Sequence, residues 1–104
     1  MIQSGHAYST SNWFVLAGSE EEFVRRWTAL AQWVKNNVPG ARSAVLIRST
    51  DDPRRFLSVV AWETQEARDA WRERFAMQEL HERCLELCEE FEVHTYSLAA
   101  STSR

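Results

Sequence analysis

The residue type best suited to do chemistry in this chain is the histidine at position 81. If residues 77–90 form a helix, one stripe of that helix carries Met77, His81, Cys84 and Cys88. The charged residues of the segment fall on its other faces. His81 is therefore expected to point inward on an otherwise apolar stripe, where a polar group needs a hydrogen-bond partner or a ligand.

Three roles are open to an inward-facing His81. It could be a hydrogen-bonded core residue, a substrate-binding or acid–base residue, or a haem ligand. The ordinary pKa of histidine lies close to neutral pH, which suits a general base. Burial favours the neutral imidazole, and that is the form that a base or a ligand needs.

The two cysteines near His81 do not predict a metal centre. A single helix separates positions seven residues apart by about 10 Å, so His81, Cys84 and Cys88 cannot all bind one zinc ion. A disulfide within one helical turn would also be strained. We expect both thiols to pack as small apolar groups, with Cys84 beside a ligand pocket. The chain has only 3 glycines and no phosphate-binding loop, which argues against a tightly held nucleotide or flavin.

The elements that must position these residues follow from hydrophobic periodicity and cap signals. Ser19 and Glu22 are typical of a capping box at the start of a helix that ends near Asn37. Thr64 is typical of a helix cap directly after a strand. The predicted strands are His6–Leu16, Ala41–Ser49, Arg55–Glu63 and Glu92–Ala99, and two further helices are predicted at Gln65 to about Glu73 and Met77 to about Glu90.

This order of elements predicts an α+β fold of the ferredoxin-like, split βαβ kind. It has a four-stranded antiparallel sheet with helices on one face. Apolar residues occupy both faces of the second and third predicted strands, as at Val45, Ile47, Val59 and Trp62. The uncovered face therefore needs a cover, and a second copy of the chain is the simplest one. We expect one domain over residues 1–104, with a core at 6–99 and a tail at 100–104, in a homodimer whose sheets pack into a shared barrel.

Composition narrows the possible partners. The net charge of the 104 residues is −3 and no basic block occurs, so nucleic acid is not expected as a partner. No apolar run approaches the roughly 20 residues of a membrane span. The first residues are mixed and polar, unlike a secretion signal, and only 2 cysteines occur. We therefore expect a cytoplasmic protein.

Several segments carry a resemblance to a known family. They are Gly18–Trp27, Val38–Ala41, Arg48–Phe56, Ala61–Thr64, Ala70–Trp71, Phe91–Glu92 and Thr95–Leu98. Together they make the chain similar to the antibiotic biosynthesis monooxygenase family from about Ser11 to Ala99. The resemblance implies a dimeric α+β barrel with a ligand cavity between the helices and the sheet. It also implies cofactor-independent oxidation of an aromatic, quinol or polyketide-like molecule by O₂.

The resemblance assigns roles to particular residues. Trp62 matches the tryptophan that precedes an acidic residue in the family, and its strand parity places it on the same face as Ser58. Ser58 stands where aromatic-oxidising relatives carry an asparagine, and Arg68 stands where they carry a tyrosine. His81 occupies the place of an arginine. We expect Trp62, His81 and, in the first strand, Asn12 to act in catalysis.

The sequence thus predicts a mainly apolar pocket between the sheet and the last two helices, touched by Trp62, Trp71 and His81. A flat substrate would stack on the rings that surround it, which also include Trp33 and Phe75.

Other functions remain open at this stage. Haem-degrading relatives carry a histidine nine or ten residues after a helix tryptophan, as His81 follows Trp71, and an asparagine near the first strand, as Asn12 is. The chain could also be a non-catalytic ligand-binding module or a polyketide cyclase. His6 and His94 could lie at the surface or at an interface.

Overall fold

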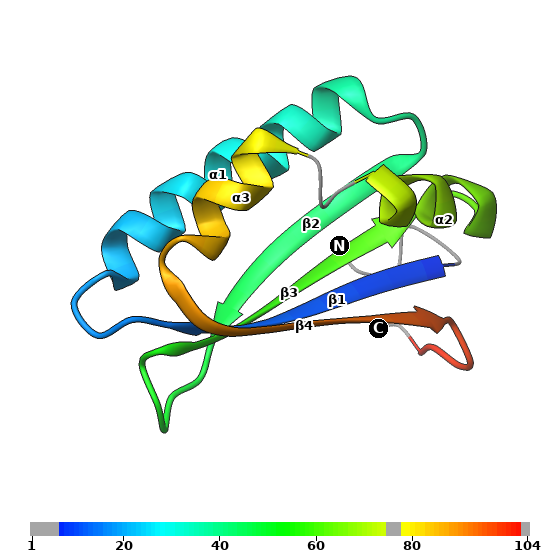
Figure 1. Cartoon of the computed structure of the whole chain (residues 1–104). Coiled ribbons are helices and arrows are strands. Elements are labelled where there is room, and N and C mark those ends of the chain that lie inside the picture. Colours follow the sequence, from blue (N-terminus) through cyan, green and yellow to red (C-terminus); the bar gives the residue numbers. More distant parts are fainter. Residues whose placement is uncertain (1–6, 75–77, 103–104) are drawn as a thin grey trace.

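The computed structural model describes residues 7–74 and 78–102, so His6, Phe75 and Met77 lie outside the described residues (Figure 1). The described elements, in chain order, are β1 (Ala7–Val15), α1 (Glu20–Asn37), β2 (Ala41–Arg48), β3 (Arg55–Trp62), α2 (Gln65–Arg74), α3 (Glu79–Leu85) and β4 (Cys88–Ser97).

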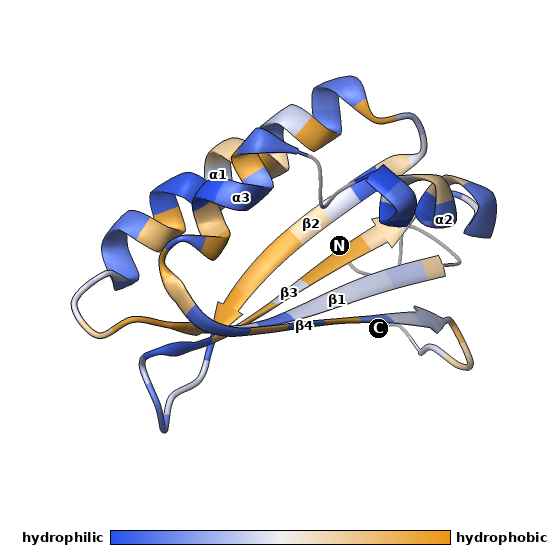
Figure 2. Ribbon diagram, in the orientation of Figure 1, coloured by the Kyte–Doolittle hydropathy of each residue, from blue (hydrophilic) through white to orange (hydrophobic). Residues whose placement is uncertain are grey.

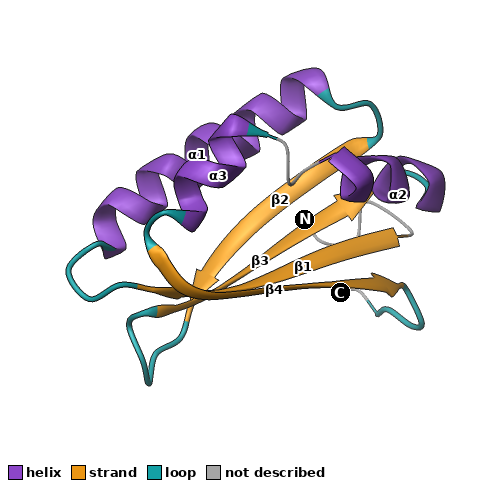
Figure 3. Ribbon diagram, in the orientation of Figure 1, coloured by secondary structure: helices purple, strands orange, loops and turns teal. Residues whose placement is uncertain are grey.

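The strands form one antiparallel sheet in the order β2-β3-β1-β4. The helices all lie over the same face of this sheet (Figure 3). This arrangement confirms the predicted α+β, ferredoxin-like fold. No helix in the described part of the chain is long and apolar enough to cross a membrane.

The longest helix, α1, packs on the sheet through the stripe that its periodicity predicts. Phe23, Leu30 and Val34 are buried, and Trp27 packs against them while it remains partly exposed. The ring of Phe23 lies between two rings of the sheet, with centroid distances of 5.2 Å to Trp13 and 5.1 Å to Phe56. These aromatic contacts fix the distance between α1 and the sheet.

The predicted capping box at the start of α1 is wrong. Ser19 is the N-cap residue, but its side chain makes no cap hydrogen bond. The carboxylate of Glu22 instead accepts hydrogen bonds from the guanidinium groups of Arg25 and Arg26. Ion pairs along the helix surface therefore replace the reciprocal cap. The predicted cap of α2 is confirmed, because the backbone N–H of Ala67 donates to Thr64 Oγ1 at 3.1 Å.

The prediction of a long last helix is also wrong. The helix α3 ends at Leu85, and the strand β4 begins only three residues later at Cys88. Cys88 pairs with Val15 and Glu90 pairs with Phe14 in the sheet ladder. Pairing with β1 overrides the local helical pattern here, so Cys88 belongs to the sheet rather than to the helix stripe.

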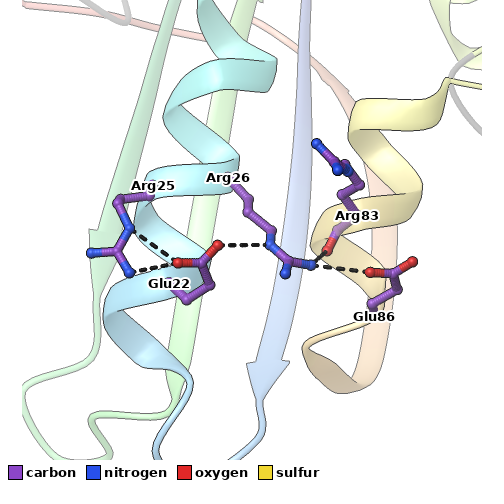
Figure 4. A network of polar contacts seen from close by, with 5 residues as sticks. All are labelled: Glu22, Arg25, Arg26, Arg83 and Glu86. Carbon is purple, nitrogen blue, oxygen red and sulfur yellow. Dashed lines mark hydrogen bonds and ion pairs between the residues drawn. The ribbon is translucent and has the colours of Figure 1, made fainter.

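A polar network holds α3 against α1 (Figure 4). Arg26 Nε donates to Glu22 Oε2 at 3.0 Å within α1. Arg26 Nη1 donates to the backbone oxygen of Arg83 at 2.8 Å and to Glu86 Oε1 at 3.1 Å. The carbonyl of Arg83 belongs to the end of α3, so one guanidinium group ties this short helix to the long one.

The turn before β2 brings α2 close to the sheet. Gly40 adopts a φ of +88°, and a Cβ atom at this position would lie 2.5 Å from the Cβ of Ala67 in α2. Only glycine fits both the backbone conformation and the contact. The turn therefore allows α2 to approach the end of the sheet.

The sheet face opposite the helices is apolar on β2 and β3, which lie side by side with β2 at the edge of the sheet. Val45 pairs with Val59 and Ile47 with Leu57 on this face, and 54% of Ile47 is exposed. Figure 2 shows β2 and β3 as apolar along much of their length.

Candidate active site

The strand register decides which side chains face the helices. Ser9 is opposite Val60, Ser11 is opposite Ser58, and their side chains lie on the helix-facing side of the sheet. They form the floor of a cavity between the sheet and the helices, which we call the inner cavity. The remaining floor residues are Trp13, Ala44, Val93 and Thr95.

All three helices supply walls of the inner cavity. The wall from α1 consists of Trp27, Leu30, Ala31 and Val34. The wall from α2 consists of Arg68, Trp71 and Arg72, and α3 supplies His81. The sequence predicts a mainly apolar cavity touched by Trp62, Trp71 and His81. Trp71 and His81 line the cavity, but Trp62 does not, and α1 forms a wall as well as the last two helices.

The inner cavity shares walls with a wider space, which we call the outer groove. The inner cavity has a volume of about 60 Å³ and the outer groove about 350 Å³. The two spaces share Trp27, Ala31, Val34, Ala44 and Val60. The groove reaches the lower end of the size range of small-molecule sites, and the smaller inner cavity beside it is the one that His81 lines.

His81 lies against aromatic rings at the edge of the cavity. Only 4% of the residue is exposed. Its ring centroid is 5.6 Å from that of Trp13 and 5.2 Å from that of Phe91. Burial lowers the pKa of His81 to about 4, because water cannot solvate the charge of a protonated imidazole at this position. At neutral pH the side chain is therefore a neutral imidazole with one donor and one acceptor nitrogen.

Two hydroxyl groups of the floor accept hydrogen bonds from indole rings. Trp13 Nε1 donates to Ser58 Oγ at 3.1 Å, and Trp62 Nε1 donates to Ser9 Oγ at 3.0 Å. Each bond joins β1 to β3 across the sheet. Both indoles are almost completely buried, with Trp13 3% and Trp62 0% exposed. The serines thus satisfy the only polar group of each tryptophan.

The charged groups of the inner cavity are all cationic. Arg68 and Arg72 lie four residues apart on α2, and no carboxylate among the described residues lines the cavity. The side chain of Arg68 is only 12% exposed. Its Nη1 donates to the backbone oxygen of Tyr96 at 3.0 Å and its Nε contacts Asp69 at 3.1 Å. These bonds hold the guanidinium group between α2 and β4.

Neither cysteine is prepared for nucleophilic or metal chemistry. Burial raises the pKa of Cys84 to about 12 and that of Cys88 to about 11. The thiol of Cys88 donates to the backbone oxygen of Cys84 at 3.4 Å. Both groups therefore remain protonated, whereas a nucleophile or metal ligand must be a thiolate. No set of three potential ligands among the described residues could hold a metal ion.

The structure brings three of the predicted site residues together, since His81, Ser58 and Trp71 all line the inner cavity. Trp33 is a second layer behind Trp71, with ring centroids 6.4 Å apart. Trp62 does not line the cavity, but its indole holds Ser9, which does.

Two other predicted residues lie away from the cavity, and a third lies in the undescribed segment. Cys84 is fully buried in the core. Asn12 is exposed and alternates with Ser11 and Trp13, so it points to the opposite face of the sheet. Phe75 lies outside the described residues.

Most residues of the cavity were not assigned to the site from the sequence, among them Ser9, Ser11, Trp13 and Trp27. The alternation of Ser9, Ser11 and Trp13 along one strand is a signal for a shared face. It does not say that this face borders a cavity rather than solid core. Trp27 follows Phe23 by four residues on the stripe of α1 that packs on the sheet, and this stripe also forms the cavity wall.

Comparison with known proteins identifies relatives of the chain. The family model described as antibiotic biosynthesis monooxygenase matches residues 11–83. A search of curated proteins finds no match.

Solved structures share the fold over almost their whole length. A protein of Bordetella bronchiseptica, proposed to be an antibiotic biosynthesis monooxygenase, is 25% identical with a TM-score of 0.77, and the match covers 93% of this chain and 100% of that one. SnoaB, a cofactor-independent oxygenase of Streptomyces nogalater, is 15% identical with a TM-score of 0.79, and the match covers 96% of this chain and 100% of SnoaB. Protein SO0527 of Shewanella oneidensis is 20% identical with a TM-score of 0.72, over 94% of this chain and 95% of its own.

Proposed function

Because the chain belongs to the antibiotic biosynthesis monooxygenase family, we propose that it oxidises an aromatic, quinol or polyketide-like molecule with O₂ and without a cofactor. The observation that carries this proposal is the neutral, buried His81 at the end of a cavity walled by aromatic rings. The shared fold of SnoaB, which is a cofactor-independent oxygenase, supports the same chemistry.

The proposed reaction needs one proton acceptor and a site that excludes water. His81 takes a proton from the substrate, which leaves an electron-rich anion. The anion passes one electron to O₂, the two radicals combine into a peroxide anion, and protonated His81 returns the proton to give a hydroperoxide. The same carbon then loses its remaining hydrogen as a proton while the O–O bond breaks, which releases water and leaves a carbonyl where the substrate had a CH₂ group. One oxygen atom enters the product and the other leaves as water, and the substrate supplies all the electrons.

The apolar walls contribute by excluding water from the anion and the hydroperoxide. Trp27 and Trp71 face the cavity from two helices, and Trp33 supports Trp71 from behind. A flat ring system can pack against these indoles. The basicity of His81 depends on the ligand, because an anionic ligand oxygen beside the imidazole raises its pKa from the low value of the empty site.

Oxygen consumption tests the proposal. The purified protein is incubated with a panel of hydroquinones and anthrone-type compounds, and O₂ uptake is compared with uptake in buffer. We expect catalysed uptake for at least one compound, with one atom of isotope-labelled O₂ recovered in the product. Uptake no faster than in buffer across the panel, despite binding of the compounds, would contradict the proposal.

A ligand-binding module without catalysis is the second candidate. A pKa of about 4 makes His81 a weak base, and this observation favours the candidate. Both candidates predict binding of aromatic compounds, but only the first predicts O₂ uptake, so the same experiment separates them.

The residues at the cavity do not fit haem. The inner cavity of about 60 Å³ cannot admit a tetrapyrrole to the imidazole of His81 unless Trp13 or Phe91 moves. Asn12, the asparagine of the haem hypothesis, lies on the face of the sheet opposite the cavity. We expect a haem titration to leave the Soret band at the position of free haem.

We also propose that the protein is a homodimer whose sheets pack face to face. The apolar face that carries Val45, Ile47, Leu57 and Val59 has no helix over it (Figure 2). A second copy of the same face would remove these side chains from water.

A further inference from the structure

The floor of the inner cavity contains two hydroxyl groups whose orientation is constrained. An indole N–H can only donate, so Ser58 must accept from Trp13 and Ser9 must accept from Trp62. The described part of the chain supplies neither serine with an acceptor for its own hydroxyl hydrogen. Each hydroxyl therefore retains its hydrogen as a donor, and both serines line the cavity.

The charged side chains that line the cavity have one sign, although Arg68 is also paired with Asp69 outside it. Arg68 and Arg72 line the same cavity, His81 is neutral, and no carboxylate among the described residues lines it. A cavity with donors on its floor and cations in its wall favours a ligand group that accepts hydrogen bonds and carries negative charge.

From this arrangement we propose that Ser58 and Ser9, oriented by the indoles of Trp13 and Trp62, bind an aromatic ligand through an ionised ring oxygen, that is, as a phenolate. This inference rests on the proposed function in one respect, because it assumes that the cavity takes an aromatic ligand. It goes further in naming the ionisation state of the ligand and the residues that select it. The serines would contact the ligand, whereas the two tryptophans would act only through the serines.

The spectrum of a bound phenol tests the proposal directly. The probe is 4-nitrophenol, which ionises close to neutral pH and absorbs differently as phenol and as phenolate. If the cavity prefers the phenolate, the bound probe titrates at lower pH than the free probe. The uncharged analogue nitrobenzene gives the affinity of the cavity for the ring alone.

Single substitutions of the serines should remove this preference. We expect Ser58→Ala and Ser9→Ala each to weaken phenolate binding about 10- to 100-fold, because each loses a hydrogen bond to a charged oxygen. Each should also return the pKa of the bound probe toward that of the free probe, and nitrobenzene affinity should hardly change. Ser11→Ala is the matched control, since it removes a hydroxyl from the same floor that no indole of the described chain orients.

A double-mutant cycle separates positioning from packing. Trp62→Phe should weaken phenolate binding several-fold in the native background and should have no further effect when Ser9 is already alanine. An equal loss in both backgrounds would mean that the indole acts through the general shape of the cavity.

The proposal is overturned if 4-nitrophenolate does not bind the native protein at millimolar concentration. It is also overturned if the serine variants lose no more affinity than Ser11→Ala does. None of these measurements requires turnover. If O₂ uptake fails but the phenolate preference is intact, the proposed oxygenase function is wrong and this inference stands. If O₂ uptake occurs but the phenolate preference is absent, this inference is wrong and the oxygenase function stands.

Discussion

The imidazole of His81 meets the phenyl ring of Phe91 edge-on, with centroids 5.2 Å apart and an interplanar angle of 79°. The two residues belong to elements that follow each other directly, α3 and β4. The contact places the histidine where the end of the helix layer meets the edge of the sheet. Its position is therefore fixed by both layers, which suits a residue that must meet a ligand in one geometry.

The first prediction concerns catalysis by His81. Replacing His81 by leucine suits the apolar surroundings, so the protein should remain folded with an equal or higher unfolding temperature. Turnover of a working substrate should fall by about two to four orders of magnitude if the general base is lost. O₂ uptake and thermal unfolding measure the two effects.

Cys84→Ala is the control for this substitution, because Cys84 is buried on the same helix but does not line the cavity. It should lower stability by about 1 kcal/mol and leave turnover intact. Unchanged turnover in His81→Leu would make His81 a core residue. A collapse of its stability would mean that His81 holds a structurally essential hydrogen bond.

A second prediction concerns stability in acid. The pKa of His81 is about 4 in the folded protein and about 6.5 when the chain is unfolded. The unfolded chain therefore binds the proton more readily, so His81 lowers stability as pH falls from 6.5 to 4. The loss amounts to about 3 kcal/mol at pH values below both constants.

Urea unfolding at a series of pH values checks this result. The native protein should lose about 3 kcal/mol more than His81→Leu between pH 7 and pH 4, because all other titrating groups are common to both. Parallel stability curves for the two proteins would rule out the depressed pKa.

A third prediction tests how α2 is held. A methyl group on Gly40 would lie 2.5 Å from the Cβ of Ala67, and the backbone there is left-handed. We expect Gly40→Ala to lower the free energy of unfolding by about 1–2 kcal/mol because of the backbone conformation, and by about 1–3 kcal/mol more because of the steric overlap. Gly18 has a φ of +90° with nothing within 4 Å of its added Cβ, so Gly18→Ala should show the first cost alone.

The double variant Gly40→Ala with Ala67→Gly should recover the part of the loss that comes from the overlap. Because α2 carries Arg68 and Trp71, Gly40→Ala should also weaken binding of aromatic ligands, and Gly18→Ala should not. Equal losses of stability in the two single glycine variants would show that α2 shifts away from the added methyl group without a loss of stability.

The last prediction concerns assembly. The chain has a mass of 12.1 kDa, and sedimentation at micromolar concentration should give about twice that value. Ile47→Glu places a charge on the apolar face of the sheet and should yield monomers. Val24→Glu alters an exposed apolar residue of α1 and should leave the dimer intact. A native protein that sediments only as a 12.1 kDa species would contradict the proposed dimer.

The sequence predicts the fold well because its strongest patterns are also its longest. The stripe of α1 and the apolar run of β3 survive in the structure almost residue for residue. The prediction of a helix over residues 86–90 is wrong, because Cys88 continues the helical spacing of His81 and Cys84 although it lies in a strand. Glu90 pairs with Phe14, which is distant in the chain, and this pairing makes the segment a strand. A local sequence pattern cannot predict such a long-range pairing.

The site was harder to predict than the fold. Strand parity correctly grouped Ser58 with the helix-facing side of β3, and helix periodicity brought His81 inward. Asn12 was placed by its distance along the chain, although its parity differs from that of Ser11. The hydrogen bond from Trp13 to Ser58 spans 45 residues of sequence, so only the sheet register reveals it.

The helix α2 buries none of its residues, yet it supplies one wall of the inner cavity. Its attachments include the cap at Thr64, the contact of Gly40 with Ala67, the bond from Arg68 to Tyr96 and the packing of Trp71 beside Trp33. Amide hydrogens of α2 should therefore exchange with solvent through local opening, far more readily than those of α1. Such opening offers a route for ligand exchange while the sheet stays intact. The residence time of a ligand then depends on the rate at which α2 opens locally. Substitutions in α2 should change this residence time without changing the melting temperature of the protein.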